Sequence, residues 1–331
     1  MSNEISLTGI KPSGTPHIGN YLGMISPALE LAREYQALYF IADYHALTTV
    51  KDRVTLKRLT YDVAASWLAL GLDPNKVIFY RQSDIPEVME LTWILACFTS
   101  KGLLNRAHAY KAAVDENLER GFSADEGINS GLFFYPALMA ADILLFDTNY
   151  VPVGLDQKQH IEIARDIAQA INSNYGEVLT LPEAVIREDV RTIPGLDGRK
   201  MSKSYGNVIP MFTPSKQLRK SVMRIVTDSR QPDEPKDPET DNVFAIYKHF
   251  AQPEDVERVR QRYLEGGLAY SQIKSDLYEL LETEFAESRE KYGQFMEDWD
   301  YLDQVLLQGA QKARKISQPK IAKVRKALGI D

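Results

Sequence analysis

Short apolar runs alternate with longer amphipathic stretches over the first 210 residues, and this alternation limits the fold more than any other feature of the chain. The runs at 5–10, 37–42, 77–80 and 150–153 have the length and composition of buried strands. Stretches with helical periodicity lie between them, such as 54–70, where Leu56, Val63 and Trp67 fall on one stripe. The pattern predicts an α/β fold with a Rossmann-like parallel sheet and crossover helices.

The pattern changes near residue 209. Beyond Pro210 the segments are helical, and a charged stretch with several prolines interrupts them at 231–242. A chain of 331 residues also exceeds the usual size of one compact core. We therefore expect two domains: an α/β domain over 1–208 with an inserted segment at about 85–130, and an all-helical domain over 209–331.

The composition narrows the class of protein. Hydrophobic residues make up 44% of the chain and charged residues 26%, and no apolar run approaches the roughly 18 residues of a membrane span. Residues 1–8 lack the regions of a secretory signal, and the single Cys97 excludes a disulfide framework or a multi-cysteine zinc site. A soluble, cytoplasmic protein is expected. Because the net charge is −7, a polyanionic partner would need a local basic patch.

The stretch KPSGTPHIGN, at 11–20, follows the first expected strand. Thr15 before Pro16 is a good helix start, with Thr15 as the cap, and it places His17 and Asn20 in the first turn. Free backbone N–H groups and the positive end of the helix dipole favour an anion there, and Gly14 and Gly19 let it approach the backbone. The stretch predicts a phosphate site; an ordinary strand-to-helix turn with a surface histidine is the alternative.

A second motif, KMSKS at 200–204, lies in a glycine-rich loop with two lysines three residues apart. Such a loop could close on a phosphate chain, where its ammonium groups would stabilise the charge that builds up on a leaving pyrophosphate. The alternative is a solvated basic loop.

In the apolar run at 132–146, Asp142 is the only charged residue. Tyr135, Met139 and Asp142 have the spacing that places them along one helix face. A carboxylate in apolar surroundings is costly unless it is paired. Asp142 is therefore expected to be an acceptor at the floor of an apolar pocket; an aspartate bonded to backbone amides at a helix end is the alternative.

HIGN and KMSKS together resemble the HIGH and KMSKS signatures of class I aminoacyl-tRNA synthetases. The stretches ADYHALT at 42–48, NSGLFFYPALMAADILL at 129–145, YVPVGLDQKQH at 150–160 and VTDS at 226–229 resemble bacterial tryptophanyl-tRNA synthetases over nearly the whole chain. The resemblance implies that L-tryptophan is activated by ATP, with Mg²⁺, to tryptophanyl-adenylate and transferred to tRNA(Trp). It also implies a homodimer and no membrane contact.

The resemblance further implies the residues of the tryptophan site. Asp142 accepts the indole N–H, Tyr135 and Gln157 hold the α-ammonium, and His45 lies beside the bound amino acid. The full set is Leu7, Gly9, His45, Tyr135, Met139, Asp142, Ile143, Val151, Val153 and Gln157.

For ATP the resemblance implies a second set, and no residue is expected to bind a metal directly. His17, Gly19 and Asn20 contact the phosphates, Gly154 and Asp156 the ribose, and Lys200 and Lys203 the pyrophosphate. The full set is Lys11, Ser13, Gly19, Asn20, Gly154, Asp156, Ile193, Lys200, Met201, Ser202 and Lys203. The catalytic residues are His17, Asn20, Lys200 and Lys203, and no protein nucleophile is needed because positioning and charge stabilisation drive an in-line displacement at phosphorus.

Three features depart from this resemblance, namely Lys11, Leu155 and the loop ahead of KMSKS, and Asp156 has a second explanation. Lys11 stands where the family has Gln near the polar end of the substrate, and Leu155 stands where it has Glu. Asp156 with Gln159 also fits a capping box at the start of a helix. Lys11 leaves open how the α-carboxylate is held, because a flexible point charge replaces an amide.

The residues themselves say less about tRNA and a second subunit than about the ligand sites. Seven Lys and Arg residues between 312 and 326 make the C-terminal segment basic, as a tRNA contact requires, although a solvated helix face is the alternative. The apolar stretch 91–98 with Leu103 and Leu104 suits a dimer interface or the core equally well.

Three other functions compete with this one. A tyrosyl-tRNA synthetase would have Gln in place of Met139. A tRNA-independent adenylyltransferase would not need the long helical C-terminal part. A catalytically silent relative would not need the intact His17, Asn20, Lys200 and Lys203.

Overall fold

A computed structural model describes residues 4–186 and 193–330. In this part of the chain five parallel strands form one sheet in the order β3-β2-β1-β4-β5. Their bounds are β1 Ile5–Ile10, β2 Gln36–Ile41, β3 Ile78–Arg81, β4 Tyr150–Pro152 and β5 Glu183–Val185. The order reverses between β1 and β4, as in a Rossmann-like sheet, so the predicted fold class is confirmed.

The four expected strands all form, with ends that shift by a residue or so. The fifth, β5, was not predicted from the sequence. It has three residues, follows Pro182, and pairs only with β4 at the edge of the sheet. A strand this short leaves too few positions for an alternating pattern to be visible.

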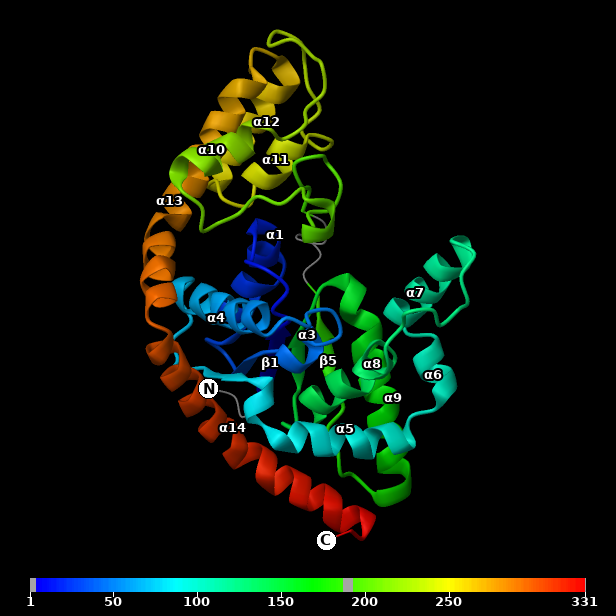
Figure 1. The fold of residues 1–331 in the computed structure, drawn as a ribbon. Coiled ribbons are helices and arrows are strands. Elements are labelled where there is room, and N and C mark those ends of the chain that lie inside the picture. Colours follow the sequence, from blue (N-terminus) through cyan, green and yellow to red (C-terminus); the bar gives the residue numbers. More distant parts are fainter. Residues whose placement is uncertain (1–3, 187–192, 331) are drawn as a thin grey trace.

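Helices cover both faces of the sheet because alternate residues of the central strands are apolar on both sides. Leu38 and Phe40 of β2 pack in a core with α5, α8 and α9, whereas Tyr39 and Ile41 pack in another core with α4. These helices are α4 Arg53–Ala69, α5 Pro86–Phe98, α8 Ser130–Leu144 and α9 Lys158–Tyr175. The short α3 Asp43–Ala46 follows β2, and α6 Lys101–Asn105 with α7 His108–Glu119 extends away from the sheet (Figure 1).

The first helix after β1 starts later than expected. His17, not Thr15, is the residue before α1 Ile18–Asn20, and its backbone N–H donates to Asn20 Oδ1 at 3.2 Å. The Thr15 hydroxyl instead donates to Asp62 Oδ2 of α4 at 2.7 Å, so a tertiary contact has replaced the predicted cap. A π-helix, η1 Tyr21–Ile25, and α2 Ser26–Leu31 continue the segment.

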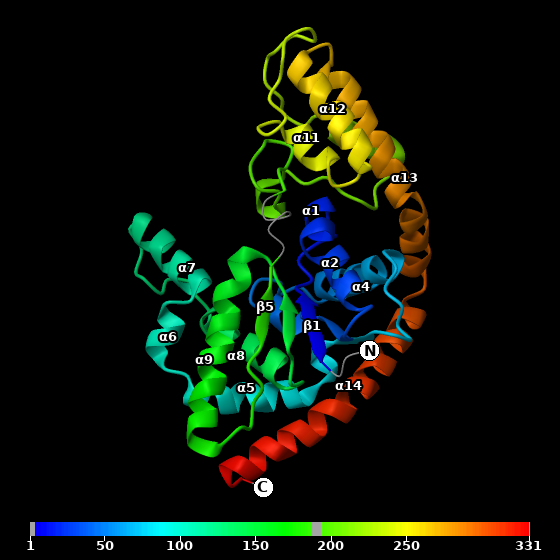
Figure 2. The ribbon, with the colours of Figure 1, turned by 180° about the vertical axis from the view of Figure 1, so that it is seen from behind.

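The part beyond residue 209 is helical where it has regular structure, and its residues from 209 to 285 share a hydrophobic core with Ile18, Leu22, Ile193 and Met201. Its helices are α10 Ser215–Met223, α11 Asn242–Tyr247, α12 Pro253–Glu265, α13 Tyr270–Glu297 and α14 Trp299–Leu328. The two long helices α13 and α14 run in an arc from this part along the side of the sheet (Figure 2). Gly309 of α14 lies so close to β3 that a Cβ there would be 1.7 Å from Phe79 O, so only glycine fits.

The basic residues of α14 bind the α/β part of the chain. The Lys320 side chain is buried and pairs with Asp147, while its Nζ also donates to Val178 O at 2.6 Å. Arg314 and Arg325 form ion pairs with Glu87 and Glu90 of α5. Lys312 and Lys323 donate to backbone carbonyls of Pro74 and Glu177. These contacts fix the last helix to the sheet and its helices.

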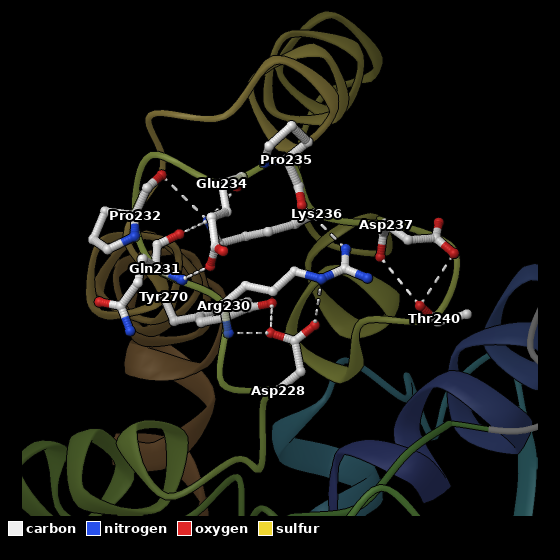
Figure 3. A network of polar contacts seen from close by, with 10 residues as sticks. All are labelled: Asp228, Arg230, Gln231, Pro232, Glu234, Pro235, Lys236, Asp237, Thr240 and Tyr270. Carbon is white, nitrogen blue, oxygen red and sulfur yellow. Dashed lines mark hydrogen bonds and ion pairs between the residues drawn. The ribbon is translucent and has the colours of Figure 1, made fainter.

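A buried lysine organises the charged stretch that precedes α11. Lys236 Nζ donates to three backbone carbonyls, those of Gln231 at 2.7 Å, Pro232 at 3.2 Å and Glu234 at 2.9 Å. Figure 3 shows this network together with Asp228, which accepts from the Tyr270 hydroxyl at 2.6 Å. The stretch 228–240 is therefore held by its own polar groups although it contains no helix or strand.

Candidate active site

Two adjoining cavities lie at the carboxyl ends of β1 and β4, where the strand order of the sheet reverses. The larger cavity has a volume of about 450 Å³ and the smaller one about 350 Å³. Both are lined by Ser13, Asn20, Met24, Val153 and Gly154, so a ligand in one can touch a ligand in the other. In open α/β sheets this crevice is the usual ligand site.

The larger cavity brings together every residue expected at the tryptophan site, from Leu7 to Gln157. Phe40, Thr48 and Leu132 also line it and were not singled out from the sequence. Gly9 is needed here because a Cβ at this position would be 2.4 Å from the ring of Phe40. The walls are mostly apolar, as suits a flat aromatic side chain.

Asp142 lies in the wall of the larger cavity and is only 2% exposed. Gln82 Nε2 donates to both of its carboxylate oxygens at 2.8 Å, and His45 Nε2 lies 3.0 Å from Oδ2. Burial raises the pKa of Asp142, while the contacts with His45 and Gln82 oppose this shift. A carboxylate has about four acceptor positions, so it can still accept a hydrogen bond from a ligand in the cavity.

The alternative explanation of Asp142, a carboxylate bonded to backbone amides at a helix end, is wrong. The residue lies near the end of α8, but its hydrogen bonds come from side chains and not from backbone amides. The N-cap of α8 is Asn129, whose Oδ1 accepts from Leu132 N at 3.0 Å.

Gln82 is the main site residue that the sequence analysis missed. Its Oε1 accepts from Tyr44 N at 3.1 Å, which fixes the orientation of the amide so that its NH₂ group faces Asp142. Asp43 fixes the same region by accepting from the Ser83 backbone and hydroxyl. Their positions in the chain were the available signal. Gln82 directly follows β3, Asp43 is the second residue after β2, and ligand sites form at this carboxyl edge of a parallel sheet.

The other end of the larger cavity is polar. The Tyr135 hydroxyl is hydrogen-bonded to His160 Nε2, and burial raises the pKa of Tyr135 to about 12, so the hydroxyl keeps its proton at neutral pH. Lys11 Nζ donates to Thr48 Oγ1 at 2.9 Å. Lys11 lines the larger cavity, although the sequence analysis grouped it with the ATP contacts.

The smaller cavity contains the residues of the two motifs. Its lining from the expected ATP set is Ser13, Gly19, Asn20, Gly154, Ile193, Lys200, Met201, Ser202 and Lys203, together with His17. His17 is 5% exposed, and among the described residues its Nδ1 has no hydrogen-bond partner. Burial, with a smaller contribution from the nearby Lys203 charge, lowers the pKa of His17 to about 4. The imidazole is therefore neutral and can donate to a phosphate.

Glycine suits the places where the two motifs approach each other, because Gly19 leaves little room for a side chain and Gly14 has a positive φ. A Cβ on Gly19 would be 3.1 Å from the ring of His17, and Gly14 has a φ of +128°. Lys203 Nζ donates to Gly14 O, and Ile18 N donates to Ile209 O at 3.1 Å. The KMSKS loop therefore packs against the start of α1, and burial lowers the pKa of Lys203.

Asp156 has a side chain outside the described part of the structure, so its expected ribose contact lies there too. The capping box expected for it with Gln159 depends on that same side chain and lies outside the described residues as well. Gln159 Oε1 accepts from His108 N at 3.0 Å and its Nε2 donates to Arg106 O at 3.2 Å, so it holds the connection between α6 and α7. Leu155 lines the smaller cavity from η3 Leu155–Gln157.

A polar contact joins the phosphate loop to the helical part of the chain. Asp62 accepts from Thr15 Oγ1 at 2.7 Å and from the Tyr292 hydroxyl of α13 at 2.8 Å. The Tyr292 ring also stacks on Phe212, which follows the KMSKS loop, with ring centroids 4.3 Å apart. Four segments distant in sequence thus meet at the phosphate loop.

Within 4–186 and 193–330, no group of three His, Cys, Asp or Glu side chains is placed to hold a metal ion. Over the same ranges, no helix is both long and apolar enough to cross a membrane. The smaller cavity instead offers imidazole, amide, hydroxyl and ammonium groups, which suit an anion.

The sequence and the structure both resemble known proteins over nearly the whole length of this chain. Residues 3–286 match the family model of the tRNA synthetases class I (W and Y). The tryptophan–tRNA ligase of Pseudomonas aeruginosa is 54% identical over 329 residues, which are 98% of this chain and 73% of that protein. The enzyme of the same name from Bordetella parapertussis is 52% identical over 332 residues, 99% of this chain and 73% of that protein.

Two crystal structures show the same arrangement. A tryptophanyl-tRNA synthetase from Campylobacter jejuni, complexed with ADP and tryptophan, has a TM-score of 0.86 and 48% identity over 98% of this chain and 99% of that one. The tryptophanyl-tRNA synthetase from Mycoplasma pneumoniae has a TM-score of 0.85 and 30% identity over 100% of this chain and 99% of that one.

Proposed function

We infer the function from one premise: the chain belongs to the class I tRNA synthetases for tryptophan and tyrosine and, within them, to the tryptophan–tRNA ligases. It is an aminoacyl-tRNA ligase that activates L-tryptophan with ATP and transfers it to tRNA(Trp). The observation that carries the choice of amino acid is the buried Asp142 in an apolar cavity that adjoins a cationic one.

Selection of tryptophan follows from that acceptor. Indole carries an N–H group at the far end of a large apolar ring, and Asp142 lies in the wall of a cavity of matching character. Phenylalanine has no donor and would leave the carboxylate without its partner, which lowers its use by roughly 10⁴-fold. Met139 on the same helix face gives an apolar contact where a tyrosine-specific site would place an amide.

The activation step takes place where the two cavities meet. One oxygen of the tryptophan carboxylate forms a bond to the α-phosphorus of ATP, the bond from that phosphorus to the bridging oxygen breaks, and pyrophosphate leaves with the electron pair. His17 donates a hydrogen bond to the phosphates as a neutral imidazole, and Asn20 supports the same loop through its contact with the His17 backbone. Lys200 and Lys203 neutralise the charge that develops on pyrophosphate.

Mg²⁺ is expected to arrive with ATP. Phosphate oxygens and water are the ligands that Mg²⁺ usually keeps in such sites, so a dedicated protein cage is not needed. The donor set of the smaller cavity agrees with this, because the described residues there offer cations and hydroxyls and no carboxylate cluster. When bound, the ion supplies charge neutralisation on the phosphate chain.

We assign tRNA binding to the helical part beyond residue 208, and adenylate formation to residues 1–208 with the segment at about 85–130 inserted. The basic residues of α14 support this less than the sequence suggested, since most of them bind the α/β part of the chain. A cytoplasmic location fits an enzyme of translation.

A homodimer is also part of the proposal. Within the segment 91–104, Leu91, Leu95 and Leu104 are buried in the chain's own core, which supports core packing for them. Trp93 is 72% exposed on α5, and Met89 and Cys97 lie exposed one turn on either side. An apolar stripe of this kind suits burial against a second subunit. Light scattering would find a dimer for the wild type and a monomer for Trp93→Glu if this face forms the interface.

ATP–pyrophosphate exchange tests the proposed function directly. We expect exchange with tryptophan, none without an amino acid, and little with tyrosine, followed by charging of bulk tRNA with tryptophan. Exchange with tyrosine alone would identify a tyrosine enzyme, and exchange without charging would contradict the tRNA step.

A further inference from the structure

Lys11 carries a positive charge inside the larger cavity, and no carboxylate of the described residues pairs with it. Its ammonium donates to the Thr48 hydroxyl at 2.9 Å, and that hydroxyl donates to His45 O at 2.8 Å. Burial lowers the pKa of Lys11, and no carboxylate among the described residues is close enough to oppose that shift. A half-buried ammonium held by one neutral hydroxyl is a site for an anionic ligand group.

The position of Lys11 along the cavity indicates which group this is. Helix α8 forms one wall, and its rise places Tyr135 about 10 Å along the axis from Asp142. Thr48 lies still further toward the start of α8, because Asn129 Nδ2 donates to Thr48 O at 3.1 Å and a Cβ on Gly131 would be 3.5 Å from Thr48 Cγ2. The pair of Lys11 and Thr48 therefore lies at the end of the cavity opposite Asp142.

The phosphate groups of ATP have other partners. His17, Lys200 and Lys203 line the smaller cavity, whereas Lys11 lines only the larger one. Ser13, two residues after Lys11, is the first residue of the loop that lines both cavities. The loop thus changes from one cavity to the other just after Lys11.

We propose that Lys11 binds the α-carboxylate of tryptophan and holds it toward the α-phosphorus of ATP. The assignment rests on the proposed function and differs from the phosphate contact that the sequence analysis expected for Lys11. Indole N–H and carboxylate lie at opposite ends of tryptophan, as Asp142 and Lys11 lie at opposite ends of the cavity. Lys11 keeps its proton throughout; it is a binding and positioning residue, and the bond changes occur on the carboxylate and on phosphorus.

Tryptamine separates this role from a general effect on the cavity, because it has the indole and ammonium groups of tryptophan and lacks the carboxylate. Binding of both ligands is measured by calorimetry on the full chain. In Lys11→Met we expect tryptophan affinity to fall about 10- to 100-fold, the loss of one charge-assisted contact, and tryptamine affinity to stay within about 3-fold. Lys11→Arg should keep most of the preference for tryptophan. Lys51→Met, at an exposed lysine that donates to Leu47 O, is the matched control and should change neither affinity.

Equal losses for both ligands would overturn the proposal, since they would indicate a structural role for Lys11. An unchanged ratio of tryptophan affinity to tryptamine affinity, together with a raised KM for ATP, would also overturn the proposal and assign Lys11 to the phosphates. Failure of the proposed function is distinguishable, because the wild type would then give no pyrophosphate exchange with tryptophan.

Discussion

Most of the larger cavity's apolar walls belong to one hydrophobic core, with Ile10 and Met24 from a second, whereas the walls of the smaller cavity belong to three. Leu7, Phe40 and Val151 of the larger cavity pack in the core between the sheet, α5, α8 and α9. In the smaller cavity, Met201 packs in the core of the helical part and Met24 against the core under α4. The substrate side chain is thus recognised inside one packed unit, and the phosphates are bound where separately packed units meet.

This difference suits the two tasks. Discrimination between amino acids needs an acceptor whose position is fixed, and the buried amide of Gln82 fixes Asp142 from behind. Binding ATP and releasing pyrophosphate need walls that can separate, and besides the apolar packing of Ile18 and Leu22 against the helical part, the units are joined there by polar contacts. They include Lys203 with Gly14 and Asp62 with Thr15 and Tyr292.

The largest expected effect tests the rigid side of this comparison. Asp142→Asn should lower kcat/KM for tryptophan in pyrophosphate exchange about 10³-fold, because a neutral amide replaces a buried carboxylate acceptor. The KM for ATP should change less than about 3-fold, since Asp142 does not line the smaller cavity. A parallel rise in both KM values would mean that the two cavities are not energetically separate.

The next effect belongs to the smaller cavity. His17→Ala and Lys203→Ala should each lower the exchange rate about 10²-fold, the scale of losing one transition-state donor, while tryptophan binding measured without ATP stays unchanged. Arg33→Ala, at an exposed residue outside both cavities, serves as the control. Unchanged exchange in both variants would remove His17 and Lys203 from the chemistry.

Gln82→Leu tests whether Asp142 needs the hydrogen bonds from Gln82 to bind tryptophan. The substitution removes the two hydrogen bonds from Gln82 to Asp142 and leaves Tyr44 N with Asp43 Oδ1 as its acceptor, so the KM for tryptophan should rise about 30-fold. The pKa of Asp142 should rise further, and activity should then increase with pH over a range where the wild type is constant. A lower melting temperature and a loss of activity without a change in the pH profile would indicate a structural effect only.

The buried His17 predicts a dependence of stability on pH. Its pKa is about 4 in the folded chain and about 6.5 when exposed, so between these values the unfolded state binds a proton that the folded state does not. The free energy of unfolding should therefore fall as the pH drops from about 6.5 toward 4, with His17 contributing roughly 1–2 kcal/mol at pH 5. His17→Gln should show a smaller fall in denaturant midpoint between pH 7 and 5. An equal fall in both proteins would contradict burial of a neutral His17.

The smallest effect concerns the contact between units. Tyr292→Phe removes the hydroxyl that donates to Asp62 and keeps the ring that stacks on Phe212. Exchange should fall about 3- to 5-fold through the KM for ATP, because Thr15 of the phosphate loop is held less firmly. Tyr301→Phe on α14 is the matched control. A change in the KM for tryptophan without a change in the KM for ATP would contradict the prediction, because it would show that the contact acts on the larger cavity.

Much of the site was predictable because its residues are grouped in the sequence. HIGN and KMSKS each place several functional groups within one turn of chain, and the helical spacing of Tyr135, Met139 and Asp142 places them along one face. The structure places all three in the wall of the larger cavity. The strands β1 to β4 were predictable for the same reason, since their patterns are local.

What the sequence determined by itself, then, is the fold class and the grouping of functional residues within each motif. Only the tertiary structure decided which groups support them: Gln82 meets Asp142 across 60 residues, His45 meets it across 97, and Lys203 meets Gly14 across 189. It also showed that Thr15 binds Asp62 instead of capping a helix, and that most basic residues of α14 are used to dock that helix. The physical reason is that a polar side chain can satisfy its hydrogen bonds with many partners, and only packing brings one of them within reach.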